Sequence, residues 1–231
     1  MSNGPMSNPA MFDFVTARQK MVDGQVRPSD VTDLRIIDAM LAVPREAFVP
    51  AALRKMAYLD IDLDVCTPGA AKRYLIKPVV IARMLQAAAI SSTDKVLVVG
   101  CATGYIAAVA SRLAGQVTAT ESDTDLAANA AARLAELGYG NVRVEPGPAA
   151  QGCVANAPYD VIVLDGATEI EPVALYRQLA PNGRLVGVFA MTTPQRAVLV
   201  TRSHDDVSSR PLFDATAPVL PGLERTPAFV F

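Results

Sequence analysis

One carboxylate and one glycine-bearing turn are the residues of this chain whose types and spacing best suit ligand chemistry. An apolar run at residues 96–99 breaks into a turn with Gly100 and Gly104, and Glu121 follows a second apolar run at residues 116–120. A glycine turn lets the backbone approach a ligand closely, and a carboxylate at the tip of the next strand accepts hydrogen bonds from two ribose hydroxyls. The pattern therefore predicts a nucleoside site.

The spacing of the glycines discriminates between nucleotides. Dinucleotide sites use Gly-x-Gly-x-x-Gly, whereas this turn has Ala102 between Gly100 and Gly104, which disfavours a nicotinamide-dependent dehydrogenase. The turn is similar to the first motif of S-adenosylmethionine (SAM) methyltransferases, Gly-x-Gly-x-Gly, with the middle glycine replaced. Ala102 suits such a turn only if its φ stays negative. An ordinary α/β turn that binds no ligand is the competing interpretation.

Composition favours one compact α/β unit and argues against several partners. The chain has 231 residues, 51% of them hydrophobic, and a net charge of −2 without a dense Lys/Arg run, so nucleic acid is not an expected partner. No stretch approaches the roughly 18 apolar residues of a membrane span, and the start lacks the features of a secretory signal. We therefore predict a cytoplasmic protein without membrane contact, and a disordered tail at residues 1–11.

The cysteines and the single histidine offer little for metal or hydrolytic chemistry. Cys66, Cys101 and Cys153 are odd in number and lack Cys-x-x-Cys spacing, which disfavours disulfides and a zinc site. His204 lies in a charged turn, but no Gly-x-Ser-x-Gly elbow accompanies it, so a Ser-His-Asp hydrolase is disfavoured. We interpret His204 as part of a solvated loop.

The elements that must position the turn alternate along the second half of the chain, which is typical of a mainly parallel sheet covered on both faces. Earlier residues read as helices and loops, with one helix capped by Ser29 or Asp30 and another that begins at Pro78. Residues 197–202 and 227–231 are expected to pair as an antiparallel edge, with only loop between them. The expected strands lie at residues 95–99, 116–120, 142–145, 160–165 and 184–189, and later helices at 125–137 and 172–179.

Several segments together resemble a known family, the protein-L-isoaspartate O-methyltransferases. The N-terminal segments are the specific part of the resemblance, because the glycine turn and a Pro-Asn-Gly segment recur across many methyltransferases. The similarity covers about residues 15–205, and the chain resembles a divergent member. The similar segments are residues 19–22, 33–40, 43–50, 96–108, 158–163 and 179–186.

The resemblance implies a Rossmann-like fold, a seven-stranded and mostly parallel sheet whose last strand is reversed. It implies a helical substrate-side region at residues 12–90 and a SAM-binding core at residues 91–231. The implied reaction transfers a methyl group from SAM to the α-carboxyl of isoaspartyl residues in damaged proteins, a step of protein repair. The nucleophile would be a carboxylate, ionised at neutral pH, so that alignment rather than a strong general base would carry catalysis.

The resemblance also implies a cofactor site around the glycine turn. Glu121 would hold the ribose, and Asp165 would lie at the end of the fourth strand of the sheet and anchor the methionine end of SAM. A divalent metal at Asp165 would need two or three further oxygen ligands, and none is evident nearby in the sequence. The expected cofactor-binding residues are Gly100, Cys101, Ala102, Gly104, Tyr105, Glu121, Ser122, Gly147, Pro148, Ala149 and Asp165.

The chain departs from the family pattern near the substrate. The family carries Gln-Thr-Ile-Ser-x-Pro; aligned on the proline, Tyr74 takes the catalytic Thr position and Ile76 takes the catalytic Ser position. An aliphatic side chain cannot donate a hydrogen bond to a carboxylate. Lys72 and Arg73 are therefore predicted to supply anion recognition for the substrate, against the alternative of solvated loop charges.

A second departure affects the adenine side. The family's Gly-Asp-Gly is Gly147-Pro148-Ala149 here, so that the carboxylate and one backbone N–H are missing. Two alternatives to isoaspartyl methylation stay open. One is a divergent paralogue with another substrate, and the other is a non-catalytic protein-binding module whose crevice is blocked by Ile76, Tyr74 or Pro148.

A separate acidic trio admits a metal interpretation. Asp60, Asp62 and Asp64 alternate, so in an extended chain their side chains would share one face. A solvated loop or substrate-side rim is the preferred interpretation, and calcium binding is the alternative.

Overall fold

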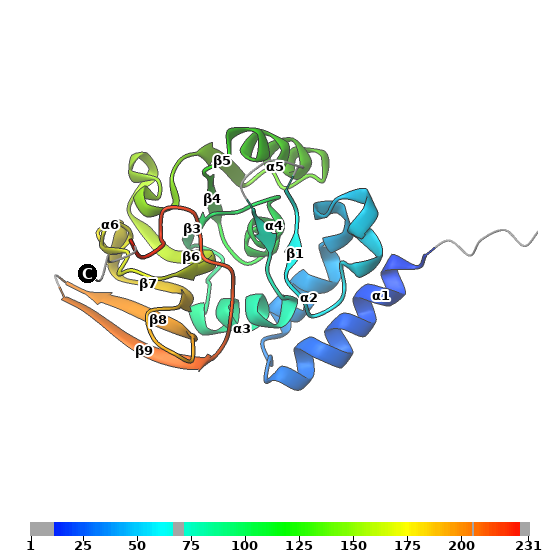
Figure 1. The fold of residues 1–231 in the computed structure, drawn as a ribbon, viewed down its shortest axis with the longest axis horizontal. Coiled ribbons are helices and arrows are strands. Elements are labelled where there is room, and N and C mark those ends of the chain that lie inside the picture. Colours follow the sequence, from blue (N-terminus) through cyan, green and yellow to red (C-terminus); the bar gives the residue numbers. More distant parts are fainter. Residues whose placement is uncertain (1–11, 67–71, 205, 227–231) are drawn as a thin grey trace, which may run out of the picture.

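A seven-stranded sheet with helices on both faces forms the centre of the molecule (Figure 1). The computed structural model of the chain describes residues 12–66, 72–204 and 206–226. The strands run in the order β5-β4-β3-β6-β7-β8-β9 across the sheet. Their bounds are β3 (Lys95–Val99), β4 (Gln116–Glu121), β5 (Val142–Pro146), β6 (Tyr159–Thr168), β7 (Leu179–Phe189), β8 (Arg196–Ser203) and β9 (Asp206–Asp214).

One strand of the sheet is reversed. The strands β5, β4, β3, β6 and β7 are parallel to one another, whereas β8 is antiparallel to both β7 and β9. The expected mostly parallel Rossmann-like sheet is therefore confirmed. The reversed strand is the next to last, not the last. The prediction of only loop after residue 202 is wrong. Residues 206–214 form β9, which pairs with β8 from Ser203–Asp206 to Arg196–Asp214.

Helices and short turns make up the rest of the described chain. Before the sheet these are α1 (Phe14–Met21), the π-helix η1 (Val22–Val26), α2 (Leu34–Ala42), α3 (Pro78–Ala88) and the 3-10 turns η2 (Arg27–Ser29), η3 (Arg45–Phe48) and η4 (Ala51–Met56). Two short strands, β1 (Leu63–Asp64) and β2 (Tyr74–Leu75), pair antiparallel. Within the sheet region lie α4 (Tyr105–Ser111), α5 (Thr124–Glu136), α6 (Val173–Tyr176), η5 (Ala149–Gln151) and η6 (Val154–Asn156).

Capping side chains decide several helix boundaries. Pro78 begins α3 as predicted, since a first-turn proline gives up no helical hydrogen bond. The predicted cap at Ser29 or Asp30 is wrong: Asp33 caps α2 by accepting from the backbone N–H of Arg35 at 2.9 Å.

The expected helix at 172–179 is shorter, because β7 already begins at Leu179. The predictions for residues 1–11 and 227–231 lie outside the described residues.

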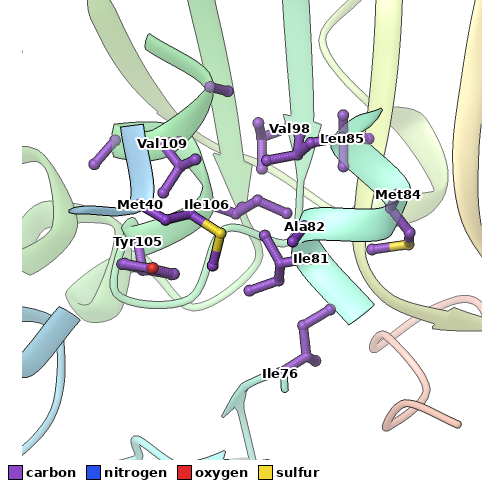
Figure 2. Packing of buried hydrophobic residues seen from close by; sticks show 14 of the residues in the cluster. Met40, Ile76, Ile81, Ala82, Met84, Leu85, Val98, Tyr105, Ile106 and Val109 are labelled. Atoms are coloured by element: carbon purple, nitrogen blue, oxygen red, sulfur yellow. The ribbon is translucent and has the colours of Figure 1, made fainter. Parts of the chain in front are cut away.

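The core forms on both faces of the sheet because strand side chains alternate. On β3, Val96 and Val98 belong to one hydrophobic cluster, and Leu97 and Val99 to the other. The larger cluster also includes Met40 of α2, which lies beside α4 in Figure 2. The N-terminal helices and one face of the sheet therefore share a core. No helix in the described ranges is long and apolar enough to cross a membrane.

Candidate functional site

The glycine turn connects the carboxyl end of β3 to α4 in a left-handed conformation. The backbone N–H groups of Gly100 and Cys101 both donate to the carbonyl of Thr120 at 2.8 Å, which holds the turn against β4. Gly100 (φ 73°) and Gly104 (φ 97°) adopt conformations that favour glycine. Ala102 also has a positive φ, 47°, so the condition stated for an alanine at this position is not met.

Glu121 lies at the end of β4, and its carboxylate points into the turn. The side chain is fully buried. Its Oε2 accepts from the backbone N–H of Ala102 at 2.8 Å, while Oε1 accepts from the N–H of Ser122 at 2.8 Å and from its hydroxyl at 3.1 Å. The carboxylate thus stabilises the strained turn residue directly.

Arg73 reaches the same carboxylate from the segment that precedes β2. Its Nε lies 3.0 Å from Oε1 of Glu121, and its Nη2 lies 2.8 Å from Oε2. The same Nη2 donates to the carbonyl of Gly100 at 2.7 Å. The Arg73 side chain is only 4% exposed. The predicted substrate-anion role does not match this placement, since the guanidinium is held inside the protein. Because the partners are 48 positions apart in the sequence, no local sequence pattern indicates the pair.

The ion pair sets the charge state of both residues. Burial alone would raise the pKa of Glu121, but the Arg73 guanidinium and the backbone donors outweigh burial, and the pKa lies below the ordinary value. Burial would lower the pKa of Arg73, and the Glu121 carboxylate raises it above its ordinary value. The pair is therefore ionised at neutral pH.

Leu220 also packs against the turn. The segment that carries it runs alongside β6: the N–H of Ala167 donates to the carbonyl of Pro218 at 2.8 Å, and the N–H of Leu220 donates to the carbonyl of Ala167 at 2.9 Å. A Cβ placed on Gly100 would lie 2.5 Å from Leu220 Cδ2, and one placed on Gly166 would lie 2.8 Å from it. The Leu220 side chain thus fills the space that these two glycines leave. Sequence reasoning missed this residue.

Asp165 is a buried carboxylate beside this turn. It lies within β6, which continues to Thr168, and not at the strand end as predicted. Neither carboxylate oxygen has a hydrogen-bond partner among the residues that the structure describes. Burial raises its pKa to about 7, although the positive charges of Arg73 and Arg45 lower it.

Arg45 is a second buried cation that sequence reasoning missed. Its Nε donates to the carbonyl of Ala57 at 2.7 Å, and its Nη2 donates to the carbonyl of Ile76 at 2.8 Å. The guanidinium lies over the ring of Tyr105, 4.7 Å from the ring centre. Burial lowers its pKa below the ordinary value. Arg45 thus ties the segment at Ile76 to Tyr105, the first residue of α4.

Comparison with known proteins gives the family. The family model described as Protein-L-isoaspartate(D-aspartate) O-methyltransferase (PCMT) matches residues 16–216. This chain belongs to the protein-L-isoaspartate O-methyltransferase family. The enzymes of this family use SAM as the methyl donor. The resemblance stated from the sequence segments is confirmed.

Relatives and solved structures support this assignment over most of the chain. "Protein-L-isoaspartate O-methyltransferase 1" of Rhodopseudomonas palustris is 40% identical over 212 residues, covering 91% of this chain and 84% of the relative. A protein-L-isoaspartate O-methyltransferase of Koribacter versatilis is 41% identical over 180 residues, with coverage of 78% and 79%. A solved protein-L-isoaspartate O-methyltransferase superposes with a TM-score of 0.79 at 25% identity, covering 90% of this chain and 67% of that one.

A further solved structure supports the fold alone. A putative protein-L-isoaspartate O-methyltransferase of Plasmodium falciparum, in complex with S-adenosyl-L-homocysteine, has a TM-score of 0.73 at 16% identity. The superposition covers 88% of this chain and 97% of that one.

The residues at the Ser and Thr positions of the methyltransferase family motif, and Lys72 before them, differ in burial. Ile76 is 1% exposed and belongs to the larger core cluster, and Figure 2 shows it on the side of Ile81. Tyr74 is half-buried on β2, opposite Asp64. Lys72 is exposed. Arg73 is paired with Glu121 and Lys77 with Asp62, which leaves the Tyr74 hydroxyl and the Lys72 ammonium as the other polar side-chain groups of this segment. Ile76 contributes packing.

The residues predicted to lie beside the adenine, 147–149, directly follow β5. The N–H of Gly147 donates to the carbonyl of Glu121 at 2.9 Å, which places this segment next to the carboxylate strand. Pro148 is exposed, whereas Ala149 is buried in the smaller core cluster. Ser122 is exposed beside them.

The acidic trio holds the start of α3. Asp60 accepts from the N–H of Val79 at 3.2 Å, and Asp62 accepts from the N–H of Lys77 at 2.9 Å. Asp64 accepts from the N–H of Cys66 at 3.1 Å. Two of the three carboxylates thus satisfy backbone donors at a helix start. In the described part of the chain no cluster of three His, Cys, Asp or Glu side chains suits a metal ion.

The residues of the turn, in this arrangement, do not fit a cofactor ribose. A carboxylate offers about four lone-pair positions. Those of Glu121 already accept from Arg73, Ser122 and the N–H of Ala102. The two unpartnered oxygens of Asp165 do suit a cationic group such as an ammonium. The structure therefore leaves the buried Asp165 oxygens without partners, whereas those of Glu121 are fully used.

Proposed function

We propose that this chain methylates the carboxyl group of isoaspartyl residues in damaged proteins, with SAM as the methyl donor, as a step of protein repair. The observation that carries the proposal is the family match over residues 16–216, together with a relative of that name at 40% identity over 91% of the chain. Isoaspartyl-containing peptides or proteins are accordingly the proposed partners, and the cytoplasm is the proposed location.

The chemistry of the acceptor fits a site without a catalytic base. An α-carboxyl has a pKa of about 3.3–3.7, so the nucleophile is ionised at neutral pH. The chain's own residues then have to bind and orient it. Ile76 cannot donate a hydrogen bond, so we assign substrate contact to the Tyr74 hydroxyl and to the exposed ammonium of Lys72. Arg73 is excluded from this role while it is paired with Glu121.

Methyl transfer from labelled SAM to an isoaspartyl peptide tests the proposal, with the aspartyl form of the same peptide as control. Selective labelling of the isoaspartyl peptide is the expected result. Equal labelling of both peptides, or none by folded protein, would contradict it.

A variant of Lys72 tests the assigned substrate contact. Lys72→Ala should raise KM for the peptide several-fold and leave kcat nearly unchanged, because an exposed charge mainly assists encounter and binding. Lys20→Ala, which removes another exposed lysine on α1, is the matched control and should change neither constant. Equal effects of the two substitutions would remove Lys72 from the proposed site.

A further inference from the structure

The Glu121 carboxylate and the space at the glycine turn are occupied by the chain itself. Arg73 pairs with both oxygens of Glu121, and Leu220 fills the space at Gly100 and Gly166. We propose that the Arg73–Glu121 ion pair is an internal lock on the cofactor site, which SAM has to displace before its ribose can reach Glu121. This inference rests on the proposed function for the identity of the ligand.

The donor positions explain why Arg73 competes with a ribose. Two adjacent ribose hydroxyls would donate one hydrogen bond to each oxygen of a carboxylate. Arg73 donates in the same manner, from Nε to Oε1 at 3.0 Å and from Nη2 to Oε2 at 2.8 Å. Since the N–H groups of Ala102 and Ser122 take further positions on the two oxygens, no free pair of acceptor sites is left.

The bond from Arg73 to Gly100 extends the lock into the turn. Nη2 of Arg73 donates to the Gly100 carbonyl at 2.7 Å, and a Cβ on Gly100 would lie 2.9 Å from that same nitrogen. The guanidinium therefore lies directly against the glycine whose missing side chain would allow a ligand to approach. Leu220 approaches the same Cβ position of Gly100, at 2.5 Å, and is 1% exposed. Arg73 and Leu220 together therefore occupy the Gly100 carbonyl, the Glu121 carboxylate and the space beside Gly100.

The energetics favour the closed arrangement in the absence of ligand. Hydrogen bonds between a guanidinium and a carboxylate are charge-assisted and about twice as strong as those between neutral groups. Ribose hydroxyls are neutral, so their hydrogen bonds to the Glu121 carboxylate would be weaker than those of the Arg73 guanidinium that they replace. The apparent dissociation constant then equals the intrinsic one divided by the open fraction. A site that is open in about one molecule in ten loses about tenfold in affinity.

Binding of S-adenosyl-L-homocysteine, followed by titration calorimetry, tests the lock without any peptide substrate. Arg73→Gln keeps a hydrogen-bond donor but cannot form the two-point ion pair, and we expect it to bind at least about tenfold more tightly than the wild type. Arg18→Gln is the matched control, since it breaks another Arg–Glu pair, with Glu46, of 3.1 Å and low exposure. We expect its affinity to equal that of the wild type. No gain for Arg73→Gln, or an equal gain in both variants, would overturn the proposal.

The wild-type protein supplies a second test that does not depend on how well Arg73→Gln folds. A crystal structure at saturating S-adenosyl-L-homocysteine should show the ribose on Glu121 and the Arg73 guanidinium withdrawn from it. A bound ribose with both Arg73–Glu121 contacts intact would overturn the lock. Either result is independent of isoaspartyl methylation, so failure of the peptide assay alone would contradict the proposed function and leave the lock standing.

Discussion

The backbone N–H of Ala102 lies 2.8 Å from Oε2 of Glu121, and this hydrogen bond holds an alanine in the left-handed region at φ 47°. A left-handed conformation costs an L-residue about 1–2 kcal/mol. The turn accepts this strain because it gives the Glu121 carboxylate a backbone donor inside the protein, where an unpaired charge would be more costly. The nucleoside-type turn therefore also serves the stability of the fold.

Replacement of Ala102 by glycine should relieve the strain. We expect Ala102→Gly to raise the free energy of unfolding by up to about 1 kcal/mol, since glycine adopts positive φ freely but loses more entropy on folding. Urea denaturation measures the change. Ala107→Gly in the interior of α4 is the control and should lower the free energy by about 1 kcal/mol. A loss of similar size at both positions would show that Ala102 carries no strain.

Removal of the Glu121 charge should destabilise the fold strongly. Glu121→Gln leaves the buried guanidinium of Arg73 without its anion, and we expect a loss of about 3–5 kcal/mol at pH 7. Glu136→Gln breaks an exposed pair with Arg133 and should cost less than about 0.5 kcal/mol. Equal losses in the two variants, measured by chemical denaturation, would argue against an important buried pair.

The same variant should change the response to acid. Because the pKa of Glu121 is lowered in the folded state, its stabilisation is present above the unfolded value and is lost as the pH falls through the folded value. The difference in unfolding free energy between wild type and Glu121→Gln should therefore shrink below about pH 4.3. A difference that stays constant from pH 7 to pH 3 would contradict the lowered pKa.

Asp165 should have the opposite pH dependence. Its folded pKa is raised from 3.8 to about 7, so its favourable contribution is complete below the unfolded pKa and is lost as the pH rises through 7. A shift of this size corresponds to a change on the order of 4 kcal/mol between pH 4 and pH 8. Asp165→Asn should lack that change and be more stable than the wild type at pH 8. Parallel pH profiles of the two proteins would refute the buried, partnerless carboxylate.

Ile76 should behave as a core residue. The side chain is 1% exposed, so Ile76→Ser should lower the free energy of unfolding by about 2–5 kcal/mol, although it introduces the hydroxyl of the family motif. Ile76→Val is the conservative comparison and should cost about 0.5–1.5 kcal/mol. A serine variant as stable as the wild type would place Ile76 outside the core.

Local patterns were sufficient for the parts of the fold that depend on short-range chemistry. The strand at residues 95–99, the turn that carries Gly100 and Gly104, and the start of α3 at Pro78 were all predicted. Each depends on backbone geometry or periodicity within a few residues. The family segments extended these local predictions to the seven-stranded sheet.

Only the tertiary structure decided what the site residues do. The sequence by itself determined that Glu121 is a carboxylate at a strand tip and that Arg73 is a cation of a loop. Their pairing depends on the residue before β2 reaching the end of β4, 48 positions later in the chain, and the placement of Leu220 depends on a segment that returns from beyond β9. Spacing does not encode such contacts, because they arise from how separate elements pack. A charge predicted to receive substrate is therefore found paired with Glu121 inside the protein.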